Sequence, residues 1–422
     1  MTTCVLKDLI EISKDGEWGK AEPSEDSVEM LCIRGTDFND VRFGSTNTTP
    51  RRHIVKRIAE RKMLQPWDLL IEAAGGTKNQ ITGRTVLLRP KLFSESELPV
   101  TCASFSRFIR LKTDLCDPEF MFWYLQYLYS AGFMHAYHTQ HTGVSRFQWT
   151  TFSEREPLEL PPLAVQRRIA GILSAYDELI DNSQRRIRIL EEMARALYRE
   201  WFVHFRFPGH EKIKQVNSSL GPIPSGWEVK TFGELYDTSS GGTPSRKRID
   251  YFENGTIDWV KSQELLDGFI LSTDERITKL GLKESSAKLF PANTVLIALY
   301  GATIGKLAIL SRDATTNQAC CAVLPKSEPF GREFAFLTLL ENRERIIGLR
   351  LGAAQQNISQ VLVRALECMK PPHDLVRRFS GKMSSLFDAI LNLQRQTSNL
   401  RRTRDLLLPR LLSGQVNLRP NL

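Results

Sequence analysis

Apolar residues recur at alternating intervals of three and four positions along two long stretches of the chain. Nine of the ten positions on the first stripe are apolar: Ile169, Leu173, Tyr176, Ile180, Ser183, Ile187, Leu190, Ala194, Leu197 and Trp201. Eight of the ten on the second are apolar: Phe379, Met383, Leu386, Ile390, Leu393, Thr397, Leu400, Arg404, Leu407 and Leu411. A mean spacing of about 3.5 residues over about five heptads is typical of the seam of a left-handed coiled coil.

Proline and glycine mark where both helices begin and end. Each stretch opens at a Pro-Pro step, 161–162 and 371–372, where proline's missing N–H costs no helical hydrogen bond. Pro208 and Gly209 follow the first stretch, and Pro409 and Gly414 close the second. The pattern therefore predicts long helices over 161–207 and 371–414. Charged residues between the seam positions favour one buried stripe per helix over the alternative of two core helices in separate domains.

The chain also repeats itself. The segment that begins at Leu160 resembles the one that begins at Lys370, a shift of 210 residues that needs no gap across some forty residues. Farther upstream, 65–71 resembles 290–297 at a shift of 225, so the first half carries about 15 extra residues between these landmarks. Two copies of one plan predict pseudo-twofold symmetry. Because both helices carry the same seam, we expect them to pair with each other as a coiled coil. The seam does not distinguish parallel from antiparallel pairing, and the pseudo-twofold symmetry favours an antiparallel coiled coil.

Short apolar runs broken by Gly, Asn, Pro and Thr fill the remaining segments and predict strands. We expect an α+β fold in which two similar domains of mixed α/β type, at 1–160 and 227–370, are joined by the two long helices. Residues 208–226 contain Asn, Ser, Gly and Pro and are predicted to form a linker into the second domain. Residues 415–422 are predicted to form a C-terminal tail.

Composition narrows the class of protein. In 422 residues, 57 Lys and Arg against 48 Asp and Glu leave a formal net charge of +9, which favours a polyanionic partner such as nucleic acid. The seven cysteines include no C-x-x-C pair, so a disulfide framework is not expected. The first residues lack the pattern of a signal peptide, and no apolar run approaches the roughly 20 residues of a membrane span. We therefore expect a cytoplasmic protein without a membrane partner.

Several segments offer groups that contact DNA. A small-residue turn at 241–243 precedes three cations at 246–248, a pattern suited to phosphates, with a solvated hairpin tip as the alternative. Amides at 317–318 and 355–357 can bond adenine bidentately. The candidate DNA-binding residues are Arg34, Arg51, Arg52, Gly76, Lys78, Asn79, Arg146, Gly242, Thr243, Ser245, Arg246, Lys247, Lys261, Tyr300, Thr303, Lys306, Asn317, Gln318, Gln355 and Gln356.

No motif indicates catalysis. The segment 300–306 resembles a phosphate-binding P-loop, but its glycines are separated by three residues instead of four and Leu307 follows the lysine. No G-x-G-x-x-G follows a strand, and both Pro-Pro steps stand in the wrong context for an amino-methyltransferase. His135, His138 and His141 would be spread around a helix, so a shared zinc site is not expected. The chain is therefore predicted to bind rather than to catalyse, with no catalytic residue, metal or cofactor of its own.

The layout and its motifs resemble the DNA-specificity (S) subunit of type I restriction-modification enzymes. The motifs that carry the resemblance are Pro161-Pro162-Leu163-Ala164-Val165-Gln166-Arg167-Arg168-Ile169-Ala170, Leu173-Ser174-Ala175-Tyr176-Asp177, Gly241-Gly242-Thr243-Pro244-Ser245, Gly301-Ala302-Thr303-Ile304-Gly305-Lys306 and Gln355-Gln356-Asn357-Ile358. The resemblance covers nearly the whole chain. In the first half, residues 72–76 and 142–146 differ from the corresponding motifs of the second half, at 301–306 and 352–357. Such differences are expected of two domains that read different DNA sequences.

The resemblance implies a non-catalytic, sequence-specific subunit that binds double-stranded DNA. Each of two target-recognition domains would read one half of a bipartite target. The helices would dock two methyltransferase (modification) subunits, which bring S-adenosylmethionine, and restriction/translocase subunits that use ATP and Mg would join them. The alternatives are a stand-alone coiled-coil DNA-binding adaptor, a specificity subunit of a related system with a fused methylase-nuclease partner, and a single-chain nuclease or methyltransferase of unfamiliar type.

Overall fold

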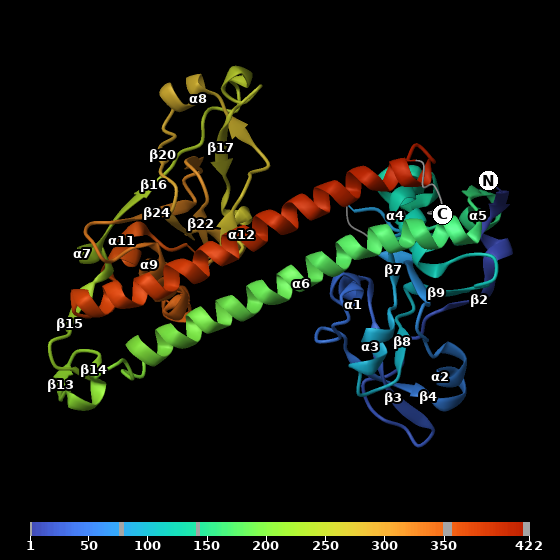
Figure 1. Cartoon of the computed structure of the whole chain (residues 1–422), viewed down its shortest axis with the longest axis horizontal. Helices are drawn as coiled ribbons and strands as arrows, with labels where there is room; N and C mark the ends of the chain where they lie inside the picture. Colours follow the sequence, from blue (N-terminus) through green and yellow to red (C-terminus); the bar gives the residue numbers. More distant parts are fainter. Residues whose placement is uncertain (1, 76–79, 141–143, 349–356, 417–422) are drawn as a thin grey trace, which may run out of the picture. The chain divides into compact units, whose positions relative to one another are not determined.

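The two longest helices of the described residues have 40 residues each, α6 (Leu163–Phe202) and α12 (His373–Leu412) (Figure 1). The computed structural model describes residues 2–75, 80–140, 144–348 and 357–416. These form two compact units, and the boundary between the units crosses both helices. Unit 1 comprises residues 1–181 and 399–422, and unit 2 comprises residues 182–398. Both predicted long helices are therefore present, and each contributes one part to each unit.

Unit 1 is a mixed α/β fold whose main sheet has the strand order β2-β9-β5-β7. A second sheet has the order β4-β3-β8, and β3 and β8 in it are parallel. The strands are β1 (Thr2–Val5), β2 (Ile10–Asp15), β3 (Ser27–Ile33), β4 (Arg51–Val55), β5 (Leu69–Glu72), β6 (Ala74–Gly75), β7 (Thr85–Leu87), β8 (Val100–Cys102), β9 (Ser106–Leu111), β10 (His138–Gln140), β11 (Ser145–Phe147) and β12 (Pro157–Leu160). The shorter α-helices are α1 (Phe38–Arg42), α2 (Lys56–Lys62), α3 (Pro90–Ser94), α4 (Pro118–Ser130) and α5 (Trp149–Arg155).

Unit 2 repeats this plan. Its main sheet has the order β16-β24-β21-β22-β18, and its second sheet β19-β17-β23-β20 contains the parallel pair β17 and β23. The strands are β13 (Gln215–Ser218), β14 (Gly221–Pro224), β15 (Glu228–Thr231), β16 (Tyr236–Ser240), β17 (Ile257–Val260), β18 (Gly268–Ile270), β19 (Arg276–Ile277), β20 (Leu289–Phe290), β21 (Val295–Ala298), β22 (Leu307–Leu310), β23 (Ala314–Thr316), β24 (Cys320–Pro325) and β25 (Glu367–Lys370). The shorter helices are α7 (Phe232–Leu235), α8 (Lys279–Lys283), α9 (Arg332–Glu341), α10 (Arg343–Gly348) and α11 (Gln360–Ala365).

Matching hydrogen bonds define the repeat more closely than the sequence does. Trp67 donates its N–H to the Leu88 carbonyl at 2.7 Å, and Asn293 donates to Leu310 at 2.8 Å. Both donors have left-handed backbones, with φ of 73° and 70°. They are separated by 226 positions, so the shift of 225 predicted from Pro66 and Pro291 was one residue short. Pro66 and Pro291 therefore occupy positions that differ by one residue within equivalent turns. The two copies share the conformation of the turn and not the position of the proline.

In unit 2, aromatic residues near the end of α6 surround one ring near the start of α12. The Phe379 ring centroid lies 4.8 Å from that of Phe202, 5.7 Å from Trp201 and 6.0 Å from Tyr198. The same buried cluster contains Phe334 of α9. The helix pair is therefore part of the core of unit 2 and not an appendage to it.

In unit 1, the beginning of α6 meets the end of α12. Ile169 and Leu173 share a buried cluster with Leu408 and Leu411. Within each unit, residues early in one helix thus meet residues late in the other, which is an antiparallel arrangement. All twenty seam positions are buried or half-buried, including Thr397 and Arg404. The predicted fold class is confirmed.

A buried ion network lies on the seam of unit 1. Asp177 of α6 is 1% exposed and accepts hydrogen bonds from Arg42 Nε of α1 at 2.8 Å and from Arg404 Nη1 of α12 at 2.5 Å. Both guanidinium groups also lie over the Trp123 ring of α4, at 5.1 and 5.4 Å from its centroid. The network therefore connects four helices through one carboxylate. It also explains why a charged residue, Arg404, occupies a seam position.

The residues predicted to form a linker, 208–226, contain regular secondary structure. A 3-10 turn (His210–Lys212) and the antiparallel hairpin of β13 and β14 occupy most of 208–226. Ile223 of this hairpin and the following Trp227 belong to the core cluster of unit 2, and Trp227 lies 5.9 Å from the Phe202 ring centroid. Gly221, Pro222 and Pro224, which contributed to the prediction of a linker, lie on β14 of this packed hairpin.

We expect Asp177→Ala to destabilise unit 1 by about 3–5 kcal/mol, because it leaves the half-buried Arg42 guanidinium without its carboxylate and Arg404 with only Asp405. Hydrogen exchange during urea unfolding would measure the loss in the amides of unit 1. The control is Glu178→Ala, which removes the adjacent, exposed carboxylate and should change the free energy of unfolding by less than about 0.5 kcal/mol. Equal effects of the two substitutions would contradict the role of the network.

Candidate nucleic-acid interface

In unit 2, three segments that are far apart in sequence meet at one edge of the domain. A Cβ on Gly241 would lie 2.0 Å from the Thr316 carbonyl oxygen, so the chain after β16 passes directly against the end of β23. The Thr243 hydroxyl then donates to the side-chain oxygen of Gln318. Glycine at 241 is therefore needed for the close approach that joins the predicted turn to the predicted amides.

The strand register brings a third segment to this edge. Ala298 pairs with Cys320, and Leu299 donates its N–H to the Ala319 carbonyl at 2.8 Å, which places Tyr300 beside Gln318. The Tyr300 ring is 40% exposed, and Thr303 donates its hydroxyl to the Tyr300 carbonyl at 3.3 Å. We call Thr243, Tyr300, Asn317 and Gln318 the unit 2 edge. The sequence predicted each of these residues separately, and the structure brings them together.

The predicted cations near this edge are mostly paired with carboxylates. Arg246 forms an ion pair with Glu275 and lies over the rings of Phe252 and Trp259, at 4.5 and 4.9 Å. Lys261 approaches the same Glu275 at 3.1 Å. Hydrogen bonds to this carboxylate raise the pKa of both cations. By contrast, Ser245 and Lys247 are exposed, and Lys247 has no carboxylate partner in the part of the chain that the structure describes.

Asp267 holds the turn that carries Lys306. Its backbone is left-handed, with φ of 64°, and its carboxylate accepts from the Leu307 N–H at 3.0 Å and pairs with Lys306 at 3.0 Å and with Arg343. Arg343 also donates to the Gly305 carbonyl at 2.9 Å. Burial acts to raise the pKa of Asp267, but these hydrogen bonds outweigh it and lower the pKa. Lys306 is therefore fixed in place and only partly available to a phosphate.

Unit 1 has an equivalent edge with different residues. A Cβ on Gly16 would lie 2.2 Å from the Cys102 carbonyl oxygen, as at Gly241, and Trp18 donates its N–H to Ser104 Oγ at 3.1 Å. Arg34 follows β3 as Lys261 follows β17, and its N–H donates to Asp37 at 2.8 Å as that of Lys261 donates to Glu264 at 2.7 Å. We call Trp18, Arg34 and Ser104, together with the neighbouring Phe105, the unit 1 edge.

The other predicted residues of unit 1 differ in their availability. Arg52 lies over the Trp18 ring, 4.5 Å from its centroid, and donates to the Trp18 carbonyl at 3.1 Å, so it supports the indole. Arg51 on β4 is exposed, with Glu29 and Glu97 no nearer than 3.9 and 3.7 Å. Arg146 on β11 is exposed. Gly76, Lys78, Asn79, Gln355 and Gln356 lie outside the described residues.

Sequence reasoning missed the most distinctive residues of the unit 1 edge. Trp18 and Phe105 are 37% and 59% exposed, although aromatic rings of this size are usually buried. Glu72 forms a bidentate ion pair with Arg84, at 2.9 and 2.8 Å, with only 6% of the Glu72 side chain exposed. A single aromatic residue in a loop has no periodicity, so no sequence signal could show that these side chains lie together.

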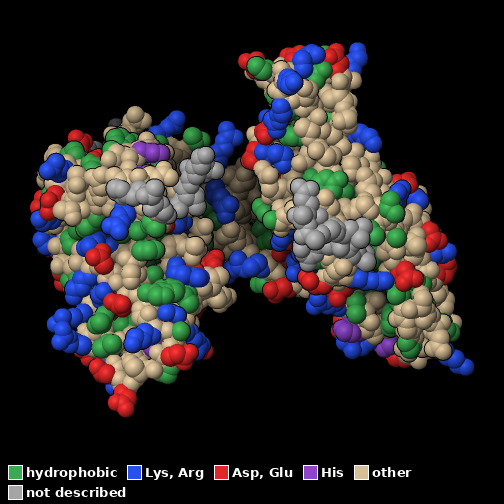
Figure 2. Space-filling model, turned by 180° about the vertical axis from the view of Figure 1, so that it is seen from behind, with side chains coloured by type: hydrophobic (Ala, Val, Ile, Leu, Met, Phe, Trp, Pro, Cys, Tyr) green, Lys and Arg blue, Asp and Glu red, His purple; other side chains and the backbone are tan. Residues whose placement is uncertain are grey.

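The face of each unit that Figure 2 shows is not uniformly basic. Figure 2 shows Lys and Arg side chains interleaved with Asp and Glu over the visible surface of each unit. Among the described residues, no group of three His, Cys, Asp or Glu is placed to hold a metal ion. In the same residues, no helix combines the length and continuous apolarity of a membrane span.

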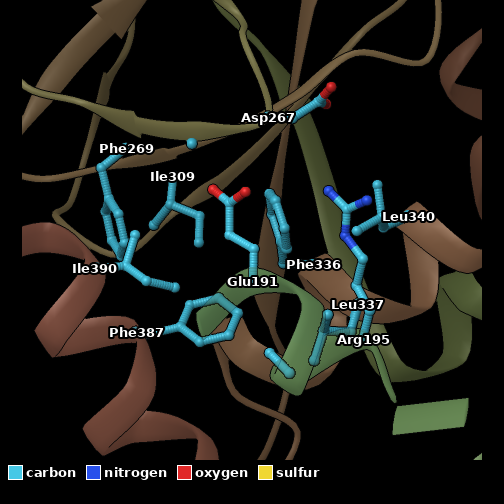
Figure 3. A pocket seen from close by; sticks show the side chains of 12 residues that line it. Glu191, Arg195, Asp267, Phe269, Ile309, Phe336, Leu337, Leu340, Phe387 and Ile390 are labelled. Atoms are coloured by element: carbon cyan, nitrogen blue, oxygen red, sulfur yellow. The ribbon is translucent and has the colours of Figure 1, made fainter. Parts of the chain in front are cut away.

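A half-buried carboxylate of α6 lies beside Asp267, the residue that pairs with Lys306. Glu191 of α6 points into a cavity of about 20 Å³ in unit 2, and Figure 3 shows its carboxylate between Ile309 and Phe336. Burial is the main cause that raises the pKa of Glu191; Arg195 opposes the shift and Asp267 adds to it. This carboxylate is held in an apolar place where its charged form is disfavoured.

The comparisons with known proteins agree with this architecture. Residues 78–192 and 224–397 match the family model of the type I restriction modification DNA specificity domain. The specificity subunit of the type I restriction enzyme MjaIX from Methanocaldococcus jannaschii is 27% identical over 298 residues, covering 69% of this chain and 68% of that protein. The HindI specificity subunit from Haemophilus influenzae is 22% identical over 322 residues, covering 61% and 69%. The crystal structure of a type I restriction-modification S subunit from M. genitalium shares the fold, with a TM-score of 0.59, 16% identity and coverage of 100% and 96%.

The fold, its duplication and the two matched segments define a protein built to recognise DNA. The chain belongs to the family of type I restriction-modification DNA specificity subunits. The predicted resemblance and the predicted role as the DNA-recognition subunit of a type I system are both confirmed. The relatives are specificity subunits, a class that is not itself catalytic.

Two substitutions in unit 2 should separate phosphate contacts from base contacts. Lys247→Ala should weaken binding to all duplexes alike and reduce the slope of log K against log salt concentration by about one. Gln318→Ala should instead relax specificity at a single base pair, by about 1–3 kcal/mol. Binding titrations over a salt series measure both effects. The control is Lys214→Ala, which replaces an exposed lysine just before β13 and should change neither. A salt slope unchanged by Lys247→Ala would contradict the assignment.

We expect Glu191→Gln to stabilise unit 2 at neutral pH, raising its thermal midpoint by at most about 2 °C. Because the folded-state pKa is raised, the wild-type carboxyl favours folding at low pH, and this contribution is lost as the pH rises through the folded pKa. The gain from the amide should therefore vanish below about pH 4. Calorimetry at several pH values tests this, with the adjacent, exposed Glu192→Gln as control. A gain that is the same at all pH values would contradict it.

Proposed function

We propose that the chain reads a bipartite target in double-stranded DNA, one half-site with each unit. The observation that supports this most directly is that the edge is duplicated. Gly16 in unit 1 and Gly241 in unit 2 both pass close to the backbone at the end of a neighbouring strand. Two residues later in each unit a hydrogen bond follows, from Trp18 to Ser104 and from Thr243 to Gln318. Equivalent positions with different side chains are what two readers of different sequences require. The unit 1 and unit 2 edges are therefore assigned to the two half-sites.

Each edge combines groups for base edges with groups for the backbone. The Gln318 amide and the Thr243 hydroxyl are of the types that hydrogen-bond base edges in the major groove. Lys247, Arg51 and Arg146 are exposed cations that would neutralise phosphates and make affinity depend on salt. Specificity then comes from the side chains that differ between the edges, and affinity from cations that are insensitive to sequence.

We assign the role of spacer to the helix pair. A helix of 40 residues is about 60 Å long, whereas one turn of B-DNA is about 34 Å. A continuous rod of that length is suited to keep two half-sites at a fixed separation. Because both helices also contribute to the core of each unit, a change in rod length would change the separation of the readers and not their internal structure.

The chemistry would be carried out by partner subunits. We propose that two methyltransferase subunits bring S-adenosylmethionine, that restriction/translocase subunits using ATP and Mg can join, and that the complex works in the cytoplasm, where the DNA is. Ile189 and Met193 lie one turn apart on α6 and are both more than half exposed. This apolar pair on a rod otherwise rich in charge is our assignment for a methyltransferase contact.

Deleting one heptad from the middle of both α6 and α12 should shift the preferred spacer by about three base pairs. The deletion preserves the seam because it removes two whole turns, and it shortens each helix by about 10 Å. Mapping methylated adenines in cells that express the variant with its methyltransferase measures the spacer.

The matched control inserts one heptad in both helices and should lengthen the spacer by the same amount. Deletion in only one helix should abolish specific methylation, since the two seams no longer match. An unchanged spacer in the deletion and insertion variants would contradict the role of the rod, while leaving recognition by the two edges in place.

A further inference from the structure

A cavity of about 680 Å³ opens at the unit 1 edge. Trp18, Phe105, Ala74 and Gly75 form its apolar walls, and Glu72 and Arg84 form a polar wall. The cavity lies where β5 ends and where the chain turns after β8. In unit 2 the equivalent place in the topology is occupied by Tyr300, Thr243 and Gln318. The cavity is thus part of the surface assigned to the first half-site.

The two aromatic side chains of the cavity are held by their backbones while their rings stay accessible. The backbone N–H of Trp18 donates to Ser104 Oγ at 3.1 Å, and the Arg52 guanidinium lies over the Trp18 ring, 4.5 Å from its centroid. The Phe105 carbonyl accepts the N–H groups of Ala73 and Ala74 at 2.8 and 3.0 Å. Neither ring belongs to a core cluster of the described residues. Fixed, exposed rings are the platforms on which unstacked bases stack in proteins.

The polar wall offers an acceptor of defined orientation. Both carboxylate oxygens of Glu72 accept from Arg84, at 2.9 and 2.8 Å, and Arg84 also donates to the Gly35 carbonyl at 3.0 Å. A Cβ at Gly35 would lie 2.8 Å from Glu72 Oε1, so a side chain there would displace the carboxylate from this position. An ionised carboxylate keeps acceptor capacity beyond one bidentate arginine, and the base groups that donate to it are exocyclic amines.

The equivalent positions of unit 2 lack this combination. Trp18 corresponds to Thr243 and Ser104 to Gln318, and in unit 2 a side-chain hydrogen bond joins these two residues. Glu72 of unit 1 corresponds to Ala298 of unit 2, because Glu72 pairs with Ser106 at the same point of the sheet where Ala298 pairs with Cys320. The aromatic walls and the carboxylate are therefore properties of the unit 1 reader and not of the shared fold.

We propose that this cavity captures one unstacked base of the first half-site, an adenine or a cytosine, between Trp18 and Phe105, with its exocyclic amine on Glu72. This inference rests on the proposed function and adds a mode of recognition at one position. It distinguishes the two units: unit 1 takes a base out of the stack at that position, whereas unit 2 reads base edges in the groove. Unstacking is least costly where the base is poorly paired, which gives the proposal a specific signature.

The test uses the complex with its methyltransferase subunits and a duplex of the methylated target sequence. At each adenine or cytosine of the first half-site, except the methylated adenine, only the opposite base is replaced so that the pair is mismatched. At one position the mismatch should tighten binding about threefold to tenfold, because the base no longer has to be unpaired. A base analogue without the exocyclic amine, purine for adenine or 2-pyrimidinone for cytosine, should weaken binding at that same position.

Variants identify the cavity as the cause. Trp18→Ala with Phe105→Ala should weaken binding of the paired target by about tenfold to a hundredfold and abolish the gain from the mismatch. Phe133→Ala, an exposed aromatic of unit 1 that does not line the cavity, is the control and should preserve both. Thermal melting of the double variant should be unchanged within about 2 °C, because both rings are exposed.

The test distinguishes failure of the base-capture proposal from failure of the proposed function. If the complex binds its target specifically but no mismatch tightens binding, or if the gain persists in the double variant, the base-capture proposal is overturned and the proposed function stands. A lowered melting temperature together with unchanged DNA binding would show that the two rings only support the fold, which also overturns it. Absence of any specific binding by the wild-type complex would instead remove the proposed function.

Discussion

The constraint on which the structure depends is that neither unit has a complete core without parts of both long helices. In unit 2, Phe379 of α12 is surrounded by rings of α6, and the sheet packs on the same cluster. In unit 1, Leu173 of α6 and Leu411 of α12 share a cluster with α4. Pairing of the two helices therefore completes the core of each unit.

Much of this architecture can be predicted from periodic features of the sequence. The seam, the 210-residue repeat of the helices and their Pro-Pro starts depend on spacing alone, and spacing survives when individual residues change. The structure places these elements close to where they were predicted. The folded hairpin at 208–226 was missed because Pro and Gly are equally suited to a tight turn and to a linker, and only the burial of Ile223 and Trp227 distinguishes them.

The candidate site could be predicted only in part, for a physical reason. Thr243, Tyr300 and Gln318 each lie beside a glycine, an amide or a small residue that indicates a loop, but their meeting depends on strand register. Cations were predicted from composition, yet Arg246 and Lys261 share Glu275, and Lys306 is held by Asp267. Trp18 and Phe105 carry no sequence signal because accessibility, and not residue type, makes them distinctive.

The Asp177–Arg404 pair has a consequence for which helices associate. At the 210-residue shift, Asp177 corresponds to Phe387 and Arg404 to Ala194, and these two line the same small cavity in unit 2. If α6 paired with a second copy of α6 in the same register, Asp177 would face alanine; in a pair of two α12 helices, Arg404 would face phenylalanine. Each mismatched pairing loses the Asp177–Arg404 ion pair across the seam, which leaves Asp177 with Arg42 alone or Arg404 with Asp405 alone and sets the charge against an apolar side chain. The two similar helices of one chain thereby discriminate against homotypic exchange with a neighbouring molecule, and a duplicated protein keeps its halves in the same polypeptide.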